Sequence, residues 1–217
     1  MDDCSIFKSV DFWRPMKIAF YSGGKESVYA ALLEWPIDAF VFLIYEFPRP
    51  SPHIANLGFA VGFGSRIAPV VVHKLPKGRE FEEKARLLRK LGVDVIVAGD
   101  VDVEDHLRYM EKLAREVGAS LKEPLWGMDH EELLRREAEE LSFYIIGGPG
   151  ELLCRRVDGS NVEEFIALAK KMSVDPLGER GEYHSQVVEV KRLVVSAEAK
   201  CVPAAVYGGY YIAEIRP

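Results

Sequence analysis

Short, continuous apolar runs alternate with amphipathic segments through the first 146 residues of this chain. The amphipathic segments repeat their apolar positions every three or four residues, as a helix with one buried face does. The apolar runs lack polar alternation, which is typical of strands that are covered on both faces. We expect such strands at residues 17–21, 38–45, 69–75, 93–100 and 143–146. This order predicts an α/β fold with a doubly wound, mainly parallel sheet.

Helix signals fill the spaces between these strands. Pro36, Gly92 and Gly118 are placed to end three of the helices. Ser160 and Glu163 have the spacing of a capping box and predict one more helix after them. The apolar positions that define the earlier helices are Val28, Ala31, Leu32, Trp35, Phe81, Ala85, Leu88, Leu107, Met110, Ala114, Val117, Leu133, Leu134, Ala138 and Leu141.

Three parts of the chain depart from this alternation. Residues 48–69 are rich in proline and glycine, so they form either a helix weakened by its glycines or a mobile loop. The segment KEPLWGMD interrupts the rhythm near residue 122, and the tail carries the β-rich runs SQVVEV, RLVVSA and VYGGYYIAEI. We therefore predict a leader at residues 1–15, a first domain at residues 16–121 and a smaller α+β part at residues 122–217.

Composition narrows the class of protein. Of the 217 residues 48% are hydrophobic, enough for the core of one domain with an appendage. The net charge of −6 argues against a large nucleic-acid-binding surface and leaves a local basic patch open. No apolar run approaches the roughly 18 residues that cross a bilayer, which argues against a membrane partner. Three widely spaced cysteines, Cys4, Cys154 and Cys201, argue against a disulfide framework or a zinc cluster and for a reducing, cytoplasmic setting. We expect Cys154 to be a small buried apolar residue.

The segment SGGKES, which we name the glycine loop, lies between the first predicted strand and the first predicted helix. The first N–H groups of a helix lack intrahelical partners and meet the positive end of the helix dipole, so an anion binds there. The glycines let the backbone approach that anion, the lysine adds a point charge, and the serines add hydroxyl groups. This pattern predicts a phosphate site. Its residues are Ser22, Gly23, Gly24, Lys25, Glu26 and Ser27.

Two common phosphate motifs do not fit the glycine loop. A Walker A motif has serine or threonine after its lysine, where Glu26 stands here. The dinucleotide pattern G-x-G-x-x-G is absent as well. An ordinary strand-to-helix turn whose serine caps the helix is the alternative. Open α/β sheets bind ligands beyond the carboxyl ends of their strands, and this position favours a ligand site.

A second segment, GERGEYHS at residues 178–185, concentrates acidic and titratable side chains, and we name it the signature segment. Glycines flank Glu179 and Glu182, so a tight turn would bring both carboxylates to one point, as a Mg²⁺ site or a proton-transfer site requires. Tyr183 and His184 add a hydrogen-bond donor and an imidazole. A charged turn with solvated glutamates is the alternative.

Together these segments resemble a known family. The glycine loop resembles the PP-loop of the N-type ATP pyrophosphatases, also called the adenine nucleotide alpha hydrolase-like superfamily. The signature segment resembles the GE-x-GEYHT motif of its diphthine–ammonia ligase branch. Other features of that branch occur in the same order, as His53, the Ala-Gly pair at residues 98–99 and Trp126 in a P-x-W segment. The resemblance covers about residues 16–190.

The resemblance implies a site for ATP and Mg²⁺. The glycine loop would hold the pyrophosphate of ATP, and Glu26 stands where the family has aspartate, in contact with magnesium or the loop backbone. Lys25, Glu179 and Glu182 would act in catalysis. Asp100, after the fourth strand, would meet magnesium or substrate.

The resemblance also implies that His53 lines the nucleotide site. Trp126, with Tyr183 and His184, would contact substrate. Read from the residues alone, His53 fits the surface equally well, Trp126 fits a plug between layers, and Asp102 or Asp105 fits a helix cap, Asp105 more so.

The activity implied is ATP-dependent amide formation. A substrate carboxylate would be adenylated and then attacked by ammonia, with release of AMP and pyrophosphate. In the resembled branch that carboxylate is diphthine, a modified histidine of elongation factor two, which would make this factor a protein partner. Two alternatives remain, namely a PP-loop enzyme with another acceptor such as a tRNA base, and a non-catalytic ATP- or AMP-binding sensor. A homo-oligomer is left open.

Overall fold

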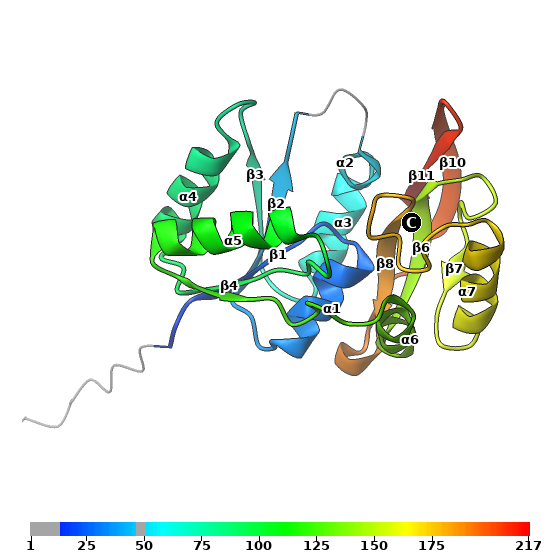
Figure 1. The fold of residues 1–217 in the computed structure, drawn as a ribbon, viewed down its shortest axis with the longest axis horizontal. Helices are drawn as coiled ribbons and strands as arrows, with labels where there is room; N and C mark the ends of the chain where they lie inside the picture. The colour runs from blue at the N-terminus through cyan, green and yellow to red at the C-terminus, as the bar shows by residue number, and fades with distance from the viewer. Residues whose placement is uncertain (1–13, 47–50) are drawn as a thin grey trace, which may run out of the picture.

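A computed structural model describes residues 14–46 and 51–217 of the chain, in which two sheets lie side by side (Figure 1). Most of the predicted leader falls outside the described residues. From left to right, Figure 1 shows a helical layer, the first sheet, a second helical layer and the second sheet. None of the described helices combines the length and the apolar character that crossing a bilayer requires.

The first sheet is parallel, which confirms the predicted doubly wound fold. Its strands run in the order β3-β2-β1-β4-β5, with Ile18 of β1 aligned to Ala39 of β2 and to Ile96 of β4. The edge strand β5 was not predicted, because the short segment Ser-Leu-Lys has no apolar run. The bounds are β1 Lys17–Phe20, β2 Ala39–Ile44, β3 Val70–Lys74, β4 Val95–Val97 and β5 Ser120–Lys122.

Helices cover both faces of this sheet, which explains its continuous apolar strands. Helices α4 (Glu80–Leu91) and α5 (Glu104–Val117) pack on one face, and α1 (Lys25–Leu33) and α3 (Leu57–Gly64) lie on the other. Gly92 and Gly118 end α4 and α5 in the left-handed conformation, as predicted.

Within residues 51–69 the structure resolves the choice between helix and loop in favour of helix. The short α2 (Pro52–Ala55) leads directly into α3. Two glycines of α3, Gly58 and Gly62, face open space, whereas a Cβ on Gly64 would lie 2.9 Å from the ring of Tyr21. A glycine at the end of α3 therefore lets the helix approach β1.

The second sheet is antiparallel, and it contains the β-rich runs of the predicted α+β part. Its order is β10-β11-β6-β8-β9, with β7 beside β6. Helix α6 leads into β6, and α7 lies at the outer side of the sheet (Figure 1). The bounds are α6 His130–Glu140, β6 Leu141–Gly148, β7 Arg156–Val157, α7 Val162–Lys171, β8 His184–Val190, the 3-10 helix η1 Lys191–Leu193, β9 Val195–Ser196, β10 Lys200–Tyr207 and β11 Tyr210–Arg216.

One apolar core joins the two sheets. Tyr21 after β1, Phe143 of β6 and Val187 of β8 are all buried and belong to the same cluster, together with residues of α1 and α3. The second sheet is therefore held against the helical layer of the first, and this packing positions the loops at their common edge.

The two expectations about helix caps were wrong. Asn161, not Ser160, is the N-cap residue of α7, because the N–H and hydroxyl of Ser160 both donate to Asp158 instead, at 2.9 and 2.6 Å. Neither Asp102 nor Asp105 caps α5. Its N-cap residue is Val103, and Asp105 lies inside the first turn.

The cysteine expectation was also wrong, because Cys154 and Cys201 form a disulfide with Cα atoms 5.3 Å apart. The N–H of Cys154 donates to the carbonyl of Ile145 in β6 at 2.9 Å, and the sulfur of Cys201 lies 4.0 Å from the same oxygen. The second sheet thus brings together two cysteines that are 47 residues apart in the sequence.

Candidate functional site

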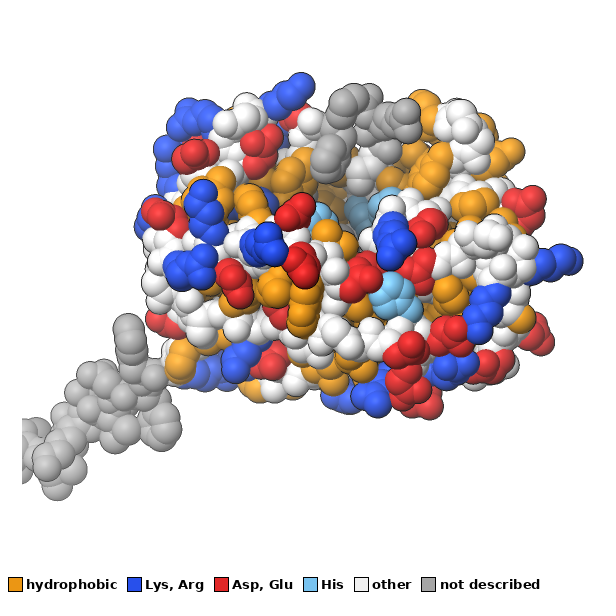
Figure 2. Space-filling model, viewed as in Figure 1, with side chains coloured by type: hydrophobic (Ala, Val, Ile, Leu, Met, Phe, Trp, Pro, Cys, Tyr) orange, Lys and Arg blue, Asp and Glu red, His pale blue; other side chains and the backbone are white. Residues whose placement is uncertain are grey.

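A cavity of about 730 Å³ opens at the carboxyl ends of β1, β2 and β4, where doubly wound sheets bind ligands. The glycine loop contributes Ser22, Glu26 and Ser27 to its wall, and residues from α4 and α5 form the opposite side. Figure 2 shows histidine and acidic side chains in the hollow between the two halves of the molecule. His53, Asp100 and Glu179 also line the cavity.

Hydrogen bonds within the glycine loop hold its turn. Gly23 has a φ of +85°, a left-handed conformation that glycine adopts without a Cβ penalty. The hydroxyl of Ser22 accepts from the N–H of Gly24 at 3.2 Å, and that of Ser27 donates to the Gly24 carbonyl at 2.9 Å. Both serines thus shape the loop and also face the cavity.

Strand β8 of the second sheet closes over the back of the glycine loop. The N–H of Val187 donates to the Gly23 carbonyl at 2.8 Å, and the hydroxyl of Ser185 accepts from the N–H of Lys25 at 3.1 Å. Ser185 therefore satisfies one of the unpaired N–H groups at the start of α1 from a position 160 residues away. A Cβ on Gly23 would lie 2.6 Å from Oε1 of Gln186, so a larger residue here would displace this side chain of β8.

The Lys25 side chain is buried rather than directed into the cavity. It is 1% exposed, and its ammonium donates to the Leu177 carbonyl at 2.7 Å and to Glu26. The same Nζ lies 5.1 Å from the ring centroid of Tyr183. Burial lowers the pKa of Lys25, but Glu26 and the other neighbours raise it further, so it lies above its ordinary value. The ammonium does not line the cavity in this structure, because the segment before Gly178 covers it, and the phosphate contact of Lys25 stays a prediction.

Carboxylates crowd one side of the cavity. Burial, reinforced by the charge of Glu26, raises the pKa of Glu179 to about 7. Burial and the charge of Asp100 raise the pKa of Glu123, which lies beside the cavity, to about 8. Each carboxylate also accepts a backbone hydrogen bond, Glu179 from Val101 at 3.2 Å and Glu123 from Asp100 at 3.3 Å.

This carboxylate crowding fits a divalent cation. Mg²⁺ binds hard oxygen ligands and usually combines one or two carboxylates with substrate phosphates. Glu26 and Asp100, the predicted ligands, both line the cavity. Within residues 14–46 and 51–217, no three histidine, cysteine or acidic side chains are arranged as a complete metal site. The donor set thus suits an ion that would share its coordination with a ligand.

Glu182 does not converge with Glu179. Its carboxylate accepts the N–H of Arg180 at 3.0 Å inside the turn, and Glu182 is not part of the cavity wall. The Gly181 residue between them is left-handed, with a φ of +82°, and the turn directs the two side chains differently. The expected carboxylate pair was therefore wrong.

The two predicted histidines lie together. The rings of His53 and His184 pack edge to face with centroids 5.1 Å apart. Burial and the neighbouring His184 lower the pKa of His53 to about 3, so its imidazole is neutral. His53 lines the cavity, whereas His184 lies behind it and contacts the hydroxyl of Tyr210.

The predicted aromatic contacts lie away from the cavity wall. The hydroxyl of Tyr183 donates to the Pro176 carbonyl at 2.6 Å, and the residue is 3% exposed. Trp126 lies in the turn before α6, and its backbone N–H donates to the Glu123 carbonyl at 3.2 Å. Neither residue lines the cavity, so substrate contact by either would require an extension of the site.

Comparison with models of known protein families identifies the family of this chain. Residues 16–121 match the diphthamide synthase N-terminal domain, and residues 129–212 match the diphthamide synthase C-terminal domain. The chain belongs to the diphthamide synthase family. This is the diphthine–ammonia ligase branch of the PP-loop ATP pyrophosphatases, as the two motifs indicated.

Comparisons with curated proteins and with solved structures add little to this family assignment. None of the curated proteins is a significant match to the chain. Among solved structures, a predicted subunit of tRNA methyltransferase from Methanocaldococcus jannaschii is similar, with 15% identity and a TM-score of 0.43. That match covers 82% of this chain and 97% of the other.

Several residues around the candidate site were not predicted. Ser185 and Gln186 stood in or beside a recognised motif without an assigned role. Glu137 is one of many glutamates in α6, yet it is fully buried, with Oε2 3.9 Å from the Lys25 ammonium. Burial raises the pKa of Glu137 well above its ordinary value, although Lys25 opposes this. Lys84 of α4 reaches the cavity wall from a helix that the sequence pattern placed only as amphipathic.

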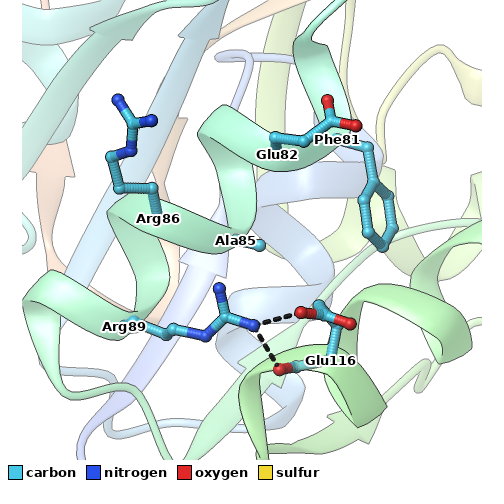
Figure 3. Close-up of a pocket in the computed structure, with 6 residues that line it drawn as sticks. All are labelled: Phe81, Glu82, Ala85, Arg86, Arg89 and Glu116. Carbon is cyan, nitrogen blue, oxygen red and sulfur yellow. Dashed lines mark hydrogen bonds and ion pairs between the residues drawn. The ribbon is translucent and has the colours of Figure 1, made fainter.

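A second hollow, of about 300 Å³, lies between α4 and α5 (Figure 3). Phe81, Arg86 and Arg89 line it, and Arg89 donates to the Glu116 carbonyl at 2.8 Å and also to its carboxylate. Its walls come from the outer helical layer, with no contribution from the strand ends. The candidate site is therefore the cavity of about 730 Å³ at the strand ends, where the glycine loop lies.

Proposed function

We propose that this diphthamide synthase family member is an ATP-dependent ligase that adenylates a carboxylate and forms an amide with ammonia, releasing AMP and pyrophosphate. The proposed acceptor is diphthine on elongation factor two. The observation that carries the proposal is the glycine loop at the end of β1, which opens onto a cavity large enough for a nucleotide and is closed from behind by the signature segment.

Binding of the triphosphate would use the start of α1. The N–H groups of Glu26 and Ser27 belong to the first turn, where a helix has no acceptors of its own, and both residues line the cavity. Ser22 adds a hydroxyl on the same wall. Ser185 and Val187 keep the loop in place, so its N–H groups are oriented before the nucleotide arrives.

Mg²⁺, held by Glu26 and Asp100, would neutralise charge on the departing pyrophosphate. The acceptor carboxylate attacks the α-phosphorus, so a P–O bond to the acceptor forms as the bond to pyrophosphate breaks. Ammonia then attacks the acyl carbon, and AMP leaves. Glu179, whose pKa of about 7 suits proton transfer near neutrality, takes the proton released by the nitrogen.

Product analysis tests this function. Incubation with ATP, Mg²⁺, ammonium and unamidated elongation factor two should give AMP, pyrophosphate and the amidated factor. Formation of ADP, or nucleotide binding with no turnover under these conditions, would contradict the ligase. Ser22→Ala should weaken ATP binding about tenfold, since it removes a hydroxyl that both shapes the loop and faces the cavity. Ser65→Ala, at the exposed end of α3, is the control.

A further inference from the structure

Lys84 is a buried cation on the wall of the nucleotide cavity. Lys84 is 7% exposed, and its side chain extends from α4 toward the ends of the strands. The ammonium lies 4.3 Å from the ring centroid of Tyr109 and 5.0 Å from that of Tyr45. Among the described residues that line this cavity, Lys84 is the single lysine or arginine.

Among the residues that the structure describes, no carboxylate pairs with the Lys84 ammonium, as one normally does with a buried charge. Lysine is rarely buried without an ion pair, because desolvation of the charge is costly. In residues 14–46 and 51–217, no carboxylate lies within 4.0 Å of its nitrogen, whereas Lys25 contacts two. Burial lowers the pKa of Lys84 to about 8, although Glu80 and Asp100 oppose this.

Two aromatic rings hold this charge without neutralising it. A ring attracts an ammonium through its quadrupole, with an energy of about 1–2 kcal/mol where water is excluded, which is less than a carboxylate supplies at contact. The cage of Tyr45 and Tyr109 therefore keeps the ammonium beside the cavity and leaves its charge available to an incoming anion.

The cavity itself needs such a charge. Glu26, Glu80, Asp100 and Glu179 line it and repel a triphosphate, and the Lys25 ammonium of the glycine loop is already bound to protein groups. We propose that Lys84 binds an anionic phosphate oxygen of the nucleotide, in the role that the sequence pattern assigned to Lys25. This assignment rests on the proposed function, since it takes the cavity as the ATP site.

Calorimetric titration of ATP and of adenosine, each with Mg²⁺, tests the assignment. Lys84→Met keeps the length of the side chain and removes its charge, and we expect ATP affinity to fall roughly thirtyfold, as for loss of one partner of a buried charge pair. Adenosine affinity should change less than about twofold, because adenosine lacks the phosphates. Lys84→Arg should recover part of the ATP affinity, since it restores the charge.

Lys112→Met is the matched control. Its ammonium also lies over an aromatic ring, 4.7 Å from the centroid of Phe81, but Lys112 is exposed and outside the cavity. It should bind ATP as the wild type does. Should Lys84→Met fold poorly, Lys84→Gln repeats the measurement with a neutral polar side chain.

The outcomes distinguish a failure of the Lys84 assignment from a failure of the proposed function. Normal ATP affinity in Lys84→Met, or equal losses for ATP and adenosine, would overturn the phosphate contact while Ser22→Ala still reports on the glycine loop. A wild-type protein that binds no ATP at all would overturn both. A selective loss of ATP binding in Lys84→Met, absent from Lys112→Met, is the expected result.

Discussion

Replacing Ser185 with alanine removes the hydrogen bond by which the second sheet holds the glycine loop. Ser185 is 3% exposed, and its hydroxyl accepts the N–H of Lys25 at 3.1 Å. Alanine leaves that N–H buried without an acceptor. Loss of a helix cap costs about 1–2 kcal/mol, and an unsatisfied buried donor costs about 1–3 kcal/mol. We therefore expect the free energy of unfolding to fall by about 1–2 kcal/mol.

The same change should weaken nucleotide binding. If about 1 kcal/mol of the loss comes from disorder of the glycine loop that ATP must reverse, the Kd for ATP rises about fivefold. Urea unfolding measures the first effect and calorimetric titration measures the second. At 217 residues, 1–2 kcal/mol corresponds to a fall in Tm of about 2–8 °C.

Ser142→Ala provides the control for this experiment. Ser142 is 1% exposed on β6, and its hydroxyl donates to Glu189 at 2.7 Å, away from the glycine loop. It should lower stability without changing ATP affinity. Two results would refute the reasoning, namely Ser185→Ala with wild-type ATP affinity, or an equal loss of ATP affinity in Ser142→Ala.

Three further predictions concern the fold and its titration. Replacing both Cys154 and Cys201 by serine should lower the free energy of unfolding by up to about 4 kcal/mol, because a 47-residue loop is no longer closed. Reductant should have the same effect on the wild type and no effect on the double variant. Gly99→Ala places a Cβ 2.9 Å from a backbone carbonyl oxygen of α1 and should cost about 1–3 kcal/mol in urea unfolding, whereas Gly58→Ala, with open space around it, should be neutral or slightly stabilising. The pKa of Glu123 is raised in the folded protein to about 8, so the stability linked to its protonated form is complete below about pH 4.5 and is lost as the pH rises through 8. Glu123→Gln should therefore gain stability relative to the wild type between pH 5 and pH 9, and parallel unfolding profiles would count against the burial of this carboxyl group.

The sequence alone predicted four of the five strands of the first sheet and the place of its loop. Continuous apolar runs such as residues 38–45 indicate strands covered on both faces, because each residue of such a strand must be buried. The glycine loop follows the first of these strands, so its position at the carboxyl edge is a consequence of chain order. The family followed from two motifs whose residue types are local, and the β-rich tail was recognised for the same reason.

Tertiary structure decided what each residue of those motifs contacts. From the sequence Lys25 is a point charge beside two glycines, whereas the structure shows Leu177 and Glu26 binding its ammonium. The role of Ser185 depends on the contact of β8 with α1, which joins residues 160 positions apart. The disulfide of Cys154 likewise depends on which strands of the second sheet are neighbours. Hydrophobic periodicity records whether a side chain is buried, but a hydrogen bond or an ion pair needs a particular partner at a particular distance. That information arises only when segments far apart in the chain pack together.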